Sequence, residues 1–404
     1  MRFPFFIFII TTLCSIAFGS QISDIVEKAK KNNPEIKEIQ EKLKKYRYKE
    51  DVEGSLPDTV FSFAVNDIQL FYRPLDRNIE PMQSLSFGIS QKVPFIKKLK
   101  KKRDIVKKSF SIETLNLKIK EQEILKNLYI SLYKIWLYRE KLKILKEYQE
   151  VLKGIIKLSN ISYTVGKASQ SDVINSQMYY TKLKEKEIKI KSLLNQETVK
   201  AKAIIGKDLK IPYFTIKQER LEKTNFLIKS IDRSPYLEKI RLQTKKQKER
   251  IKLAQLNLYP DFTFFAKYFY RKSFNDYISA GISITLPFLN KKKHLSEIIY
   301  QKTEKKVLEK KYTSEKIKLI SQIKENIFKY EETEETYRIL KTLLFQSKKS
   351  FETVLSEFKV GKKNMVDVLF SLKQLIALKE EILENIFNRN VTVIRIKGLL
   401  GELK

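Results

Sequence analysis

The sequence predicts a mainly α-helical chain with a small β part. Long antiparallel helical coiled coils are expected to form an α-barrel, and four strands per chain to contribute to a β-barrel. Three observations predict this fold class. Two stretches of about 70 residues contain no proline and almost no glycine, the residues that commonly end helices. Short stretches rich in β-branched and aromatic residues include two that alternate with a period of two. A twelve-residue motif also occurs twice.

The repeated motif is a glycine turn between two long helical patterns. It reads YTVGKASQSDVI in residues 163–174 and FKVGKKNMVDVL in residues 358–369. Gly166 and Gly361 are 195 residues apart, and Gly206 and Gly401 keep the same spacing. We therefore predict an internal duplication, far longer than a solenoid unit. Its parts are a first repeat over 20–206, a linker over 207–234 and a second repeat over 235–404.

Composition limits the possible functions. The chain has 404 residues and a formal net charge of +34. This balance indicates either an anionic partner, nucleic acid or a lipid surface, or lysines that simply solvate long helices. Cys14 and His294 are the only cysteine and histidine, so thiol catalysis, disulfides and Cys/His metal sites are nearly excluded. The sequence contains no phosphate loop, paired carboxylates or nucleophile–base set, and we expect neither an enzyme nor a cofactor.

Residues 1–19 have the features of a cleavable signal peptide. A basic residue precedes an apolar run over 3–18, and the small residues Ala17 and Gly19 fit a signal-peptidase site after Gly19. A membrane span needs about 20 apolar residues, so an uncleaved anchor is the weaker alternative. Leu13 stands before Cys14, where a lipoprotein signal has a small residue, and we expect no lipidation.

Two β-hairpins are predicted, over residues 57–94 and 260–287. The returning strand of each alternates apolar and small polar residues, which gives one apolar face and one small polar face. Membrane strands have about ten residues and direct an apolar face toward lipid. The positions predicted to face lipid are Leu85, Phe87, Ile89, Ile278, Ile282 and Ile284.

The predicted long helices cover residues 96–165 and 289–360. At 1.5 Å per residue, a helix of about 70 residues reaches roughly 105 Å, which is a coiled-coil length. Two apolar stripes on the first helix indicate a neighbour on each side, as in a closed wall of helices. One stripe contains Ile135, Leu142, Ile156, Tyr138, Leu145 and Leu152, and the other contains Ile144, Tyr148, Val151, Ile155 and Leu158.

Shorter helices are predicted over residues 22–53, with a break at Asn33–Pro34, and over 168–206, 235–258 and 363–401. Two short helices placed end to end match one long helix in length. Each half can therefore pack a long helix against a stacked pair. The linker over 207–234 is mixed in character, and we predict that it forms an equatorial band on the outside of the helices.

Trimerisation is predicted from the number of strands. No stretch after the signal peptide is apolar enough for a membrane helix, so a membrane crossing would have to use strands. Four strands cannot close a barrel, and open strand edges are not tolerated in lipid. We therefore predict a homotrimer whose three chains build one 12-stranded β-barrel.

The second glycine turn resembles a motif of the TolC-like outer membrane efflux proteins. An aromatic residue, Val360, Gly361 and Lys362 are followed by a Val-Asp-Val-Leu segment that contains Asp367. The duplication and the order of helices and strands are similar as well. The resemblance implies an outer membrane channel that extends into the periplasm, the passive exit duct of a tripartite efflux or type I secretion system. It also implies a periplasmic adaptor (membrane fusion) protein and an inner membrane pump, of RND or ABC type, as partners.

The same resemblance implies roles for residues at the turns. In the related pattern two acidic residues constrict the periplasmic mouth of the pore; here Asp367 matches the first, and Phe370 stands in place of the second. We expect Asp367 and Phe370 to form the periplasmic gate. Asp172 is interpreted as a helix N-terminal charge that the dipole favours. The tip residues expected to bind the adaptor are Val165, Gly166, Lys167, Val360, Gly361 and Lys362.

Two basic runs, residues 97–103 and 291–294, follow the hairpins. They indicate either contact with anionic lipid head groups or solvated helix starts. The alternative function is a non-conducting periplasmic or surface coiled-coil protein, which would need neither a closed barrel nor a duplicated glycine turn. Nucleic acid is not an expected partner of an exported chain with amphipathic strands.

Overall fold

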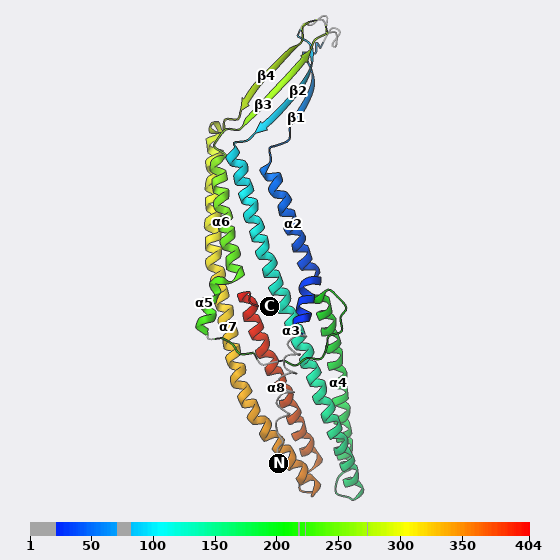
Figure 1. Ribbon diagram of the computed structural model, residues 1–404. Helices are drawn as coiled ribbons and strands as arrows, with labels where there is room; N and C mark the ends of the chain where they lie inside the picture. The colour runs from blue at the N-terminus through cyan, green and yellow to red at the C-terminus, as the bar shows by residue number, and fades with distance from the viewer. Residues whose placement is uncertain (1–21, 71–81, 217–218, 223, 273) are drawn as a thin grey trace, which may run out of the picture. The chain divides into compact units, whose positions relative to one another are not determined.

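The computed structural model describes residues 22–70, 82–216, 219–222, 224–272 and 274–404 (Figure 1). The predicted signal peptide, with Cys14, and most of the first hairpin loop lie outside these ranges. Residues 22–32 are helical. The elements that follow are α2 (Pro34–Gly54), β1 (Val60–Asn66), β2 (Ser84–Val93), α3 (Ile96–Thr164), α4 (Gln170–Ile205), α5 (Thr224–Ser230), η1 (Ile231–Arg233), α6 (Pro235–Leu256), β3 (Phe262–Tyr270), β4 (Tyr277–Ile284), η2 (Pro287–Asn290), α7 (Lys291–Lys359) and α8 (Met365–Leu400).

The predicted class, mainly helical with a small β part, is confirmed. The four strands form one antiparallel sheet in the order β1-β2-β3-β4. The two longest helices, α3 and α7, have 69 residues each, and α4 and α8 have 36 each. None of the helices in the described part of the chain is both long enough and apolar enough to cross a membrane.

The two halves present the same order of elements: a helix, a hairpin, a 69-residue helix and a 36-residue helix. The internal duplication that this order suggests stays a prediction. Helix α7 begins at Lys291 and not at 289, because the 3₁₀ helix η2 occupies the residues from Pro287 onward. The linker also contains regular structure that its mixed composition did not indicate, the helix α5 and the 3₁₀ helix η1.

The break at Asn33 is a helix cap. The Asn33 Oδ1 accepts hydrogen bonds from the backbone amides of Glu35 and Ile36 at 2.9 and 3.3 Å. Pro34 occupies the first position of α2, where a helix needs no amide donor. The Asn33 Nδ2 donates to the Ile204 carbonyl at 2.7 Å, which ties this cap to the end of α4. The polar dipeptide therefore divides the first helix without leaving backbone groups unpaired.

The chain divides into two compact units. We call one the helical unit, which comprises the described residues up to Glu38 and those in Leu117–Tyr236 and Lys316–Lys404. We call the other the sheet unit, which comprises Ile39–Asn116 and Leu237–Glu315. Both 69-residue helices contribute residues to each unit.

The helical unit has two apolar clusters. The first surrounds the middle of α3, where Leu125, Leu128 and Leu132 are completely buried. Ile211 and Phe214 of the linker belong to this cluster. The linker therefore supplies core side chains, and the apolar residues around Pro212 pack inward because burial removes them from water. The equatorial band on the outside of the helices stays a prediction.

The second cluster joins α3, α4, α7 and α8. Its buried members include Leu145 and Tyr148 of α3, Leu183 of α4, Phe358 of α7 and Met365 of α8. Leu145 comes from one predicted stripe of α3 and Tyr148 from the other. Both stripes therefore pack against neighbouring helices in this unit. Gln149, which interrupts the first stripe, is buried as well and donates to the Glu187 carboxylate of α4 at 2.9 Å.

In the sheet unit, polar pairs join neighbouring helices. Between α3 and α6, Lys101 Nζ lies 2.6 Å from a Glu249 carboxylate oxygen. Between α6 and α7, Gln247 is buried and donates to the Gln301 carbonyl at 3.0 Å. Between α2 and α3, Lys102 Nζ lies 3.6 Å from Glu53. These contacts fix the order of the helices below the sheet.

Candidate functional site

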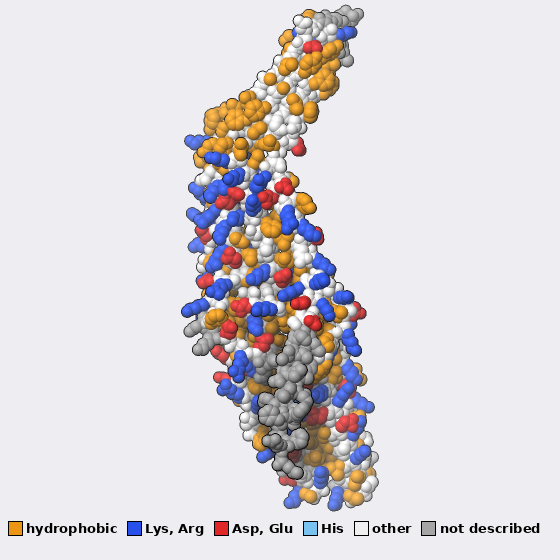
Figure 2. Space-filling view, viewed as in Figure 1, with side chains coloured by type: hydrophobic (Ala, Val, Ile, Leu, Met, Phe, Trp, Pro, Cys, Tyr) orange, Lys and Arg blue, Asp and Glu red, His pale blue; other side chains and the backbone are white. Residues whose placement is uncertain are grey.

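One face of the sheet is apolar and exposed. Directly opposed residues of antiparallel strands share a face, and the register pairs Phe63 with Phe87 and Phe264 with Ile282. Hydrophobic side chains, in orange, gather over the strands in Figure 2. This surface, here named the apolar face, consists of Phe61, Phe63, Val65, Leu85, Phe87, Ile89, Phe264, Tyr268, Tyr270, Ile278, Ile282 and Ile284.

All six positions predicted to face lipid lie on the apolar face. Ile278 is 74% exposed and Ile282 is 58% exposed, although each is a large aliphatic side chain. Contiguous exposed apolar surface of this kind marks a place that another molecule or a membrane covers. The geometry therefore fits the lipid-facing prediction, and contact with lipid itself stays a prediction.

The opposite face combines small residues with larger ones, among them Lys267, Phe265 and the stacked pair Phe269 and Tyr277. Gly88 lies opposite Lys267, and Gly281 lies opposite Phe265. A Cβ on Gly88 would lie 2.5 Å from the Ser62 Oγ and 3.1 Å from the Lys267 Cγ, and one on Gly281 would lie 2.7 Å from the Phe265 ring. The glycines therefore leave room for a lysine and an aromatic ring across the strand. This face carries small polar side chains and the positive charge of Lys267 beside the aromatic rings.

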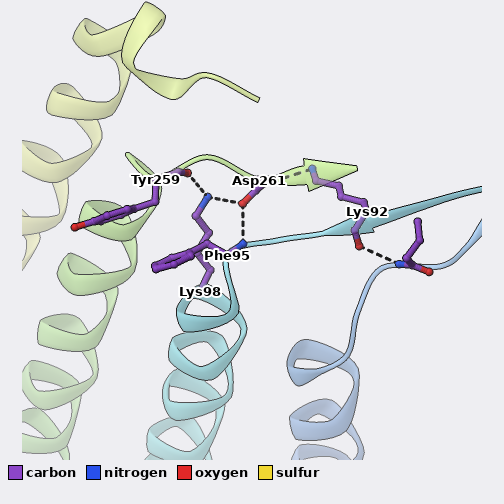
Figure 3. A network of polar contacts seen from close by, with 6 residues as sticks. Lys92, Phe95, Lys98, Tyr259 and Asp261 are labelled. Carbon is purple, nitrogen blue, oxygen red and sulfur yellow. Dashed lines mark hydrogen bonds and ion pairs between the residues drawn. The ribbon is translucent and has the colours of Figure 1, made fainter. Parts of the chain in front are cut away.

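A buried ion pair joins the sheet to helix α3 (Figure 3). The Lys98 Nζ donates to the Asp261 carboxylate at 2.6 Å and to the Tyr259 carbonyl at 2.8 Å. The same carboxylate accepts from the Phe95 amide at 3.1 Å, and the rings of Phe95 and Tyr259 stack with centroids 5.0 Å apart. Burial raises the pKa of Asp261, but the Lys98 ammonium and the Phe95 amide outweigh it and hold the pKa below its ordinary value.

This network corrects the interpretation of one residue in the first basic run. Neither lipid contact nor a solvated helix start describes Lys98, which is buried and paired with an acid 163 residues away. Lys101 and Lys102 likewise pair with Glu249 and Glu53. No local pattern signals these pairs, because the partners come together only when the hairpins and helices pack.

Each of the two helix tips turns on a glycine in the left-handed conformation. Gly166 and Gly361 have φ angles of 71° and 80°, in the left-handed region that side chains oppose. In the second tip the Lys362 amide donates to the Glu357 carbonyl at 2.9 Å, which satisfies a terminal carbonyl of α7. Val165 and Val360 are 61% and 67% exposed beside these glycines. Lys167 and Lys362 are exposed as well.

Two aspartates occupy the same position after these tips but have different surroundings. Ser169 caps α4, and the Asp172 carboxylate accepts hydrogen bonds from the Ser169 amide at 2.9 Å and hydroxyl at 2.8 Å, a capping box. Asn364 caps α8 and accepts from the Asp367 amide at 2.9 Å. Within the described residues the Asp367 carboxylate itself makes no hydrogen bond or ion pair. Asp172 thus has a structural role, and Asp367 keeps its carboxylate available. The Ser-x-x-Asp signature could have revealed this difference in the sequence.

Helix α8 presents Asp367 beside an apolar strip. Asp367 is half-buried, Phe370 is 61% exposed and Val366 is 54% exposed. Residues three apart on a helix lie about 60° apart around the axis, so Asp367 and Phe370 occupy adjoining positions. Whether copies of these side chains from other chains meet at a gate stays a prediction. The described residues contain no group of three or more His, Cys, Asp or Glu side chains placed to hold a metal ion.

Comparison with known proteins gives one family. Residues 227–402, which include Gly361, Asp367 and Phe370, match the model of the outer membrane efflux protein family. A search of the curated proteins found no match.

Solved structures have the same fold along almost the whole chain. CusC is 12% identical to this chain and superposes on it with a TM-score of 0.82; the alignment covers 94% of this chain and 92% of the CusC chain. VceC from Vibrio cholerae is 14% identical over 94% of this chain and 96% of its own, with a TM-score of 0.74. The outer membrane channel CmeC from Campylobacter jejuni is 13% identical, with a TM-score of 0.77; the alignment covers 95% of this chain and 86% of the CmeC chain. Residues 227–402 are thus similar to the outer membrane efflux protein family, and the chain has the fold of these solved structures.

Proposed function

We propose that this chain is the outer membrane channel of a tripartite efflux or type I secretion system. It acts as a passive conduit in the outer membrane and the periplasm, and the inner membrane pump supplies the energy. The observation that carries the proposal is the sheet, which has an exposed apolar face and an opposite face with small polar side chains and Lys267. Residues 227–402 of the same chain match the efflux family, and two helices have 69 residues each. A passive conduit needs a path and a gate and no catalytic residue.

Trimerisation follows from the edges of the sheet. Strands β1 and β4 are its edges, and each leaves one row of backbone groups without a strand partner in the described chain. Because each chain has four strands, β4 of one copy runs antiparallel to β1 of the next, so copies can continue the same ladder. Three copies give 12 strands, within the range of known membrane barrels. The apolar face then contacts lipid, and the face with Lys267 lines the water-filled path.

The proposed gate lies at the start of α8. Three copies of Asp367 around one axis would hold a negative potential at a narrow mouth and favour cations. The availability of the Asp367 carboxylate, in contrast to the Asp172 carboxylate in its capping box, supports this choice. Phe370, exposed on the adjoining position, would add an apolar collar. Opening requires the helices at this end to move apart.

Docking of the periplasmic adaptor is assigned to the two tips. Val165 and Val360 are exposed apolar residues beside glycines whose conformation fixes the shape of each turn. Lys167 and Lys362 place a positive charge next to each valine. A partner with an apolar contact and an acidic group would fit both tips. The adaptor would connect them to an inner membrane pump of RND or ABC type.

The decisive experiment is a combined test of assembly and conductance. We expect the purified chain to sediment as a trimer in mild detergent, to resist dissociation on moderate heating, and to conduct ions in planar lipid bilayers. A folded monomer without conductance would contradict the proposal and would favour the alternative, a non-conducting coiled-coil protein. The same preparation serves the gate variants described below.

A further inference from the structure

A cavity of about 350 Å³ lies among α2, α3, α6 and α7 of the sheet unit. Part of its lining is apolar, with Ile105 of α3 and Leu253 of α6. Four cationic side chains line it as well: Lys49 of α2, Lys102 of α3, and Lys246 and Arg250 of α6. The cavity therefore combines hydrocarbon surface with a concentration of positive charge contributed by three helices.

The two acids in the lining offset only part of this charge. Glu53 lies 3.6 Å from Lys102, and Glu297 accepts a hydrogen bond from the Gln301 amide at 2.8 Å. In the described part of the chain, Lys49, Lys246 and Arg250 form no ion pair or hydrogen bond with another side chain. In the described chain these three positive charges thus share the cavity with one carboxylate, Glu297, that forms an ion pair with none of them, and four cations against two acids leave the lining with a net positive charge.

These three charges repel one another. Lys246 and Arg250 are four residues apart on α6, which places them as neighbours on one helix face, where like charges are destabilising. Lys246 is half-buried. Its burial, together with the nearby Arg250 and Lys49, lowers its pKa. The positive charge of Lys246 is therefore less favourable here than in water, and an anion in the cavity would offset this cost.

We propose that this cavity is a binding site for a phosphate group, held by Lys246, Arg250 and Lys49. A guanidinium matches two phosphate oxygens at once, and an ammonium adds a point charge that several oxygens can share. The apolar lining beside Ile105 and Leu253 has room for the hydrocarbon part of an amphiphile. The group can come from a phospholipid head group or from a free phosphate. The site belongs to the sheet unit, whereas the proposed gate and tips belong to the helical unit, so it goes beyond the conduit function and does not depend on it.

The test measures binding to the purified full-length protein in a neutral detergent. Titration calorimetry uses two probes, inorganic phosphate and a short-chain phosphatidylglycerol, each against chloride at the same ionic strength. The variants are Lys246→Gln and Arg250→Gln. The matched control is Lys248→Gln, an exposed lysine on the same helix that does not line the cavity.

We expect each cavity variant to weaken binding at least about tenfold, equivalent to about 1.4 kcal/mol, and the control to bind as the unchanged protein does. Binding of inorganic phosphate identifies a site for free phosphate, whereas binding of the phospholipid alone identifies a lipid site; either result supports the proposal. Failure of both probes, or equal binding by all variants, overturns it.

A second measurement keeps the proposal testable if one variant fails to fold. Without an added anion, Lys246→Gln and Arg250→Gln should each raise the midpoint of thermal unfolding, because each removes repulsion. Lys248→Gln should leave the midpoint unchanged. A lowered midpoint in the cavity variants would mean that the charges stabilise the empty site, which contradicts the proposal.

Discussion

Replacing Lys98 by methionine should destabilise the base of the sheet by about 3 kcal/mol. The side chains of Lys98 and Asp261 are 9% and 19% exposed, and their charged atoms lie 2.6 Å apart. Removing one partner of a buried pair costs about 3–5 kcal/mol because the remaining charge is left without compensation. We expect the lower end of this range, since the Phe95 amide still donates to Asp261 and Lys92 Nζ lies 4.0 Å from its other oxygen.

A double-mutant cycle with Asp261→Asn separates the interaction energy of the Lys98–Asp261 pair from the effects of each substitution on its other neighbours. The free energy of unfolding is measured in detergent by circular dichroism during guanidinium denaturation. Fluorescence of Trp136, the only tryptophan, reports on the helical unit in the same experiment. The double variant Lys98→Met/Asp261→Asn should be clearly more stable than the sum of the single changes predicts, because no buried charge is left alone.

The same pair predicts a dependence on pH. The pKa of Asp261 is depressed in the folded protein, so the pair's contribution is fully present above the ordinary aspartate pKa of about 3.9 and is lost as the pH falls through the folded value. The stability difference between the unchanged protein and Lys98→Met should therefore shrink below about pH 4. Three results would refute the reasoning: additive effects of the two single substitutions, a loss of stability below about 1 kcal/mol in Lys98→Met, or a stability difference that stays constant with pH.

Three further outcomes are expected. Asp367→Asn should shift the reversal potential in planar bilayers toward lower cation selectivity, whereas Asp172→Asn should leave it unchanged; equal effects would remove the gate assignment. Gly361→Val should abolish export in cells and leave the trimer in the outer membrane, because the left-handed turn at this tip opposes a side chain; normal export would exclude a docking role. Gly206→Ala should lower the thermal midpoint more than Gly166→Ala. Both glycines are left-handed, but only at Gly206 would a Cβ lie 2.7 Å from a backbone oxygen, that of Asn32; equal midpoints would contradict this steric reading.

Local sequence patterns were sufficient for much of the fold. The two 69-residue helices follow from the absence of helix-ending residues, and β2 and β4 follow from their period of two. Gly166 and Gly361 could be assigned a left-handed conformation because few other residues tolerate it after a helix. Each of these features depends on residues that are neighbours in the chain, so the sequence carries the whole signal.

Contacts between distant residues could not be predicted in this way. Lys98 sits in a basic run like its neighbours, and only the approach of Asp261 makes it a buried ion pair. Phe214 becomes a core residue only because the linker packs against α3. The two aspartates after the tips are an intermediate case: the Ser169–Asp172 capping box is a local pattern, but the availability of Asp367 depends on what surrounds it in the fold.

The net charge of the chain decides how an unpaired lysine should be interpreted. With 81 lysines and arginines against 47 acids, at least 34 cations cannot have an acidic partner of their own. A missing partner is therefore the normal condition of a lysine on these helices, and by itself it indicates no binding site. Lys248 is such a residue, exposed and stabilised by water. Lys246 differs because it is half-buried beside two other unpaired cations, where water compensates its charge less well. Burial among like charges is thus the observation that distinguishes a ligand site from a solvated surface in this protein.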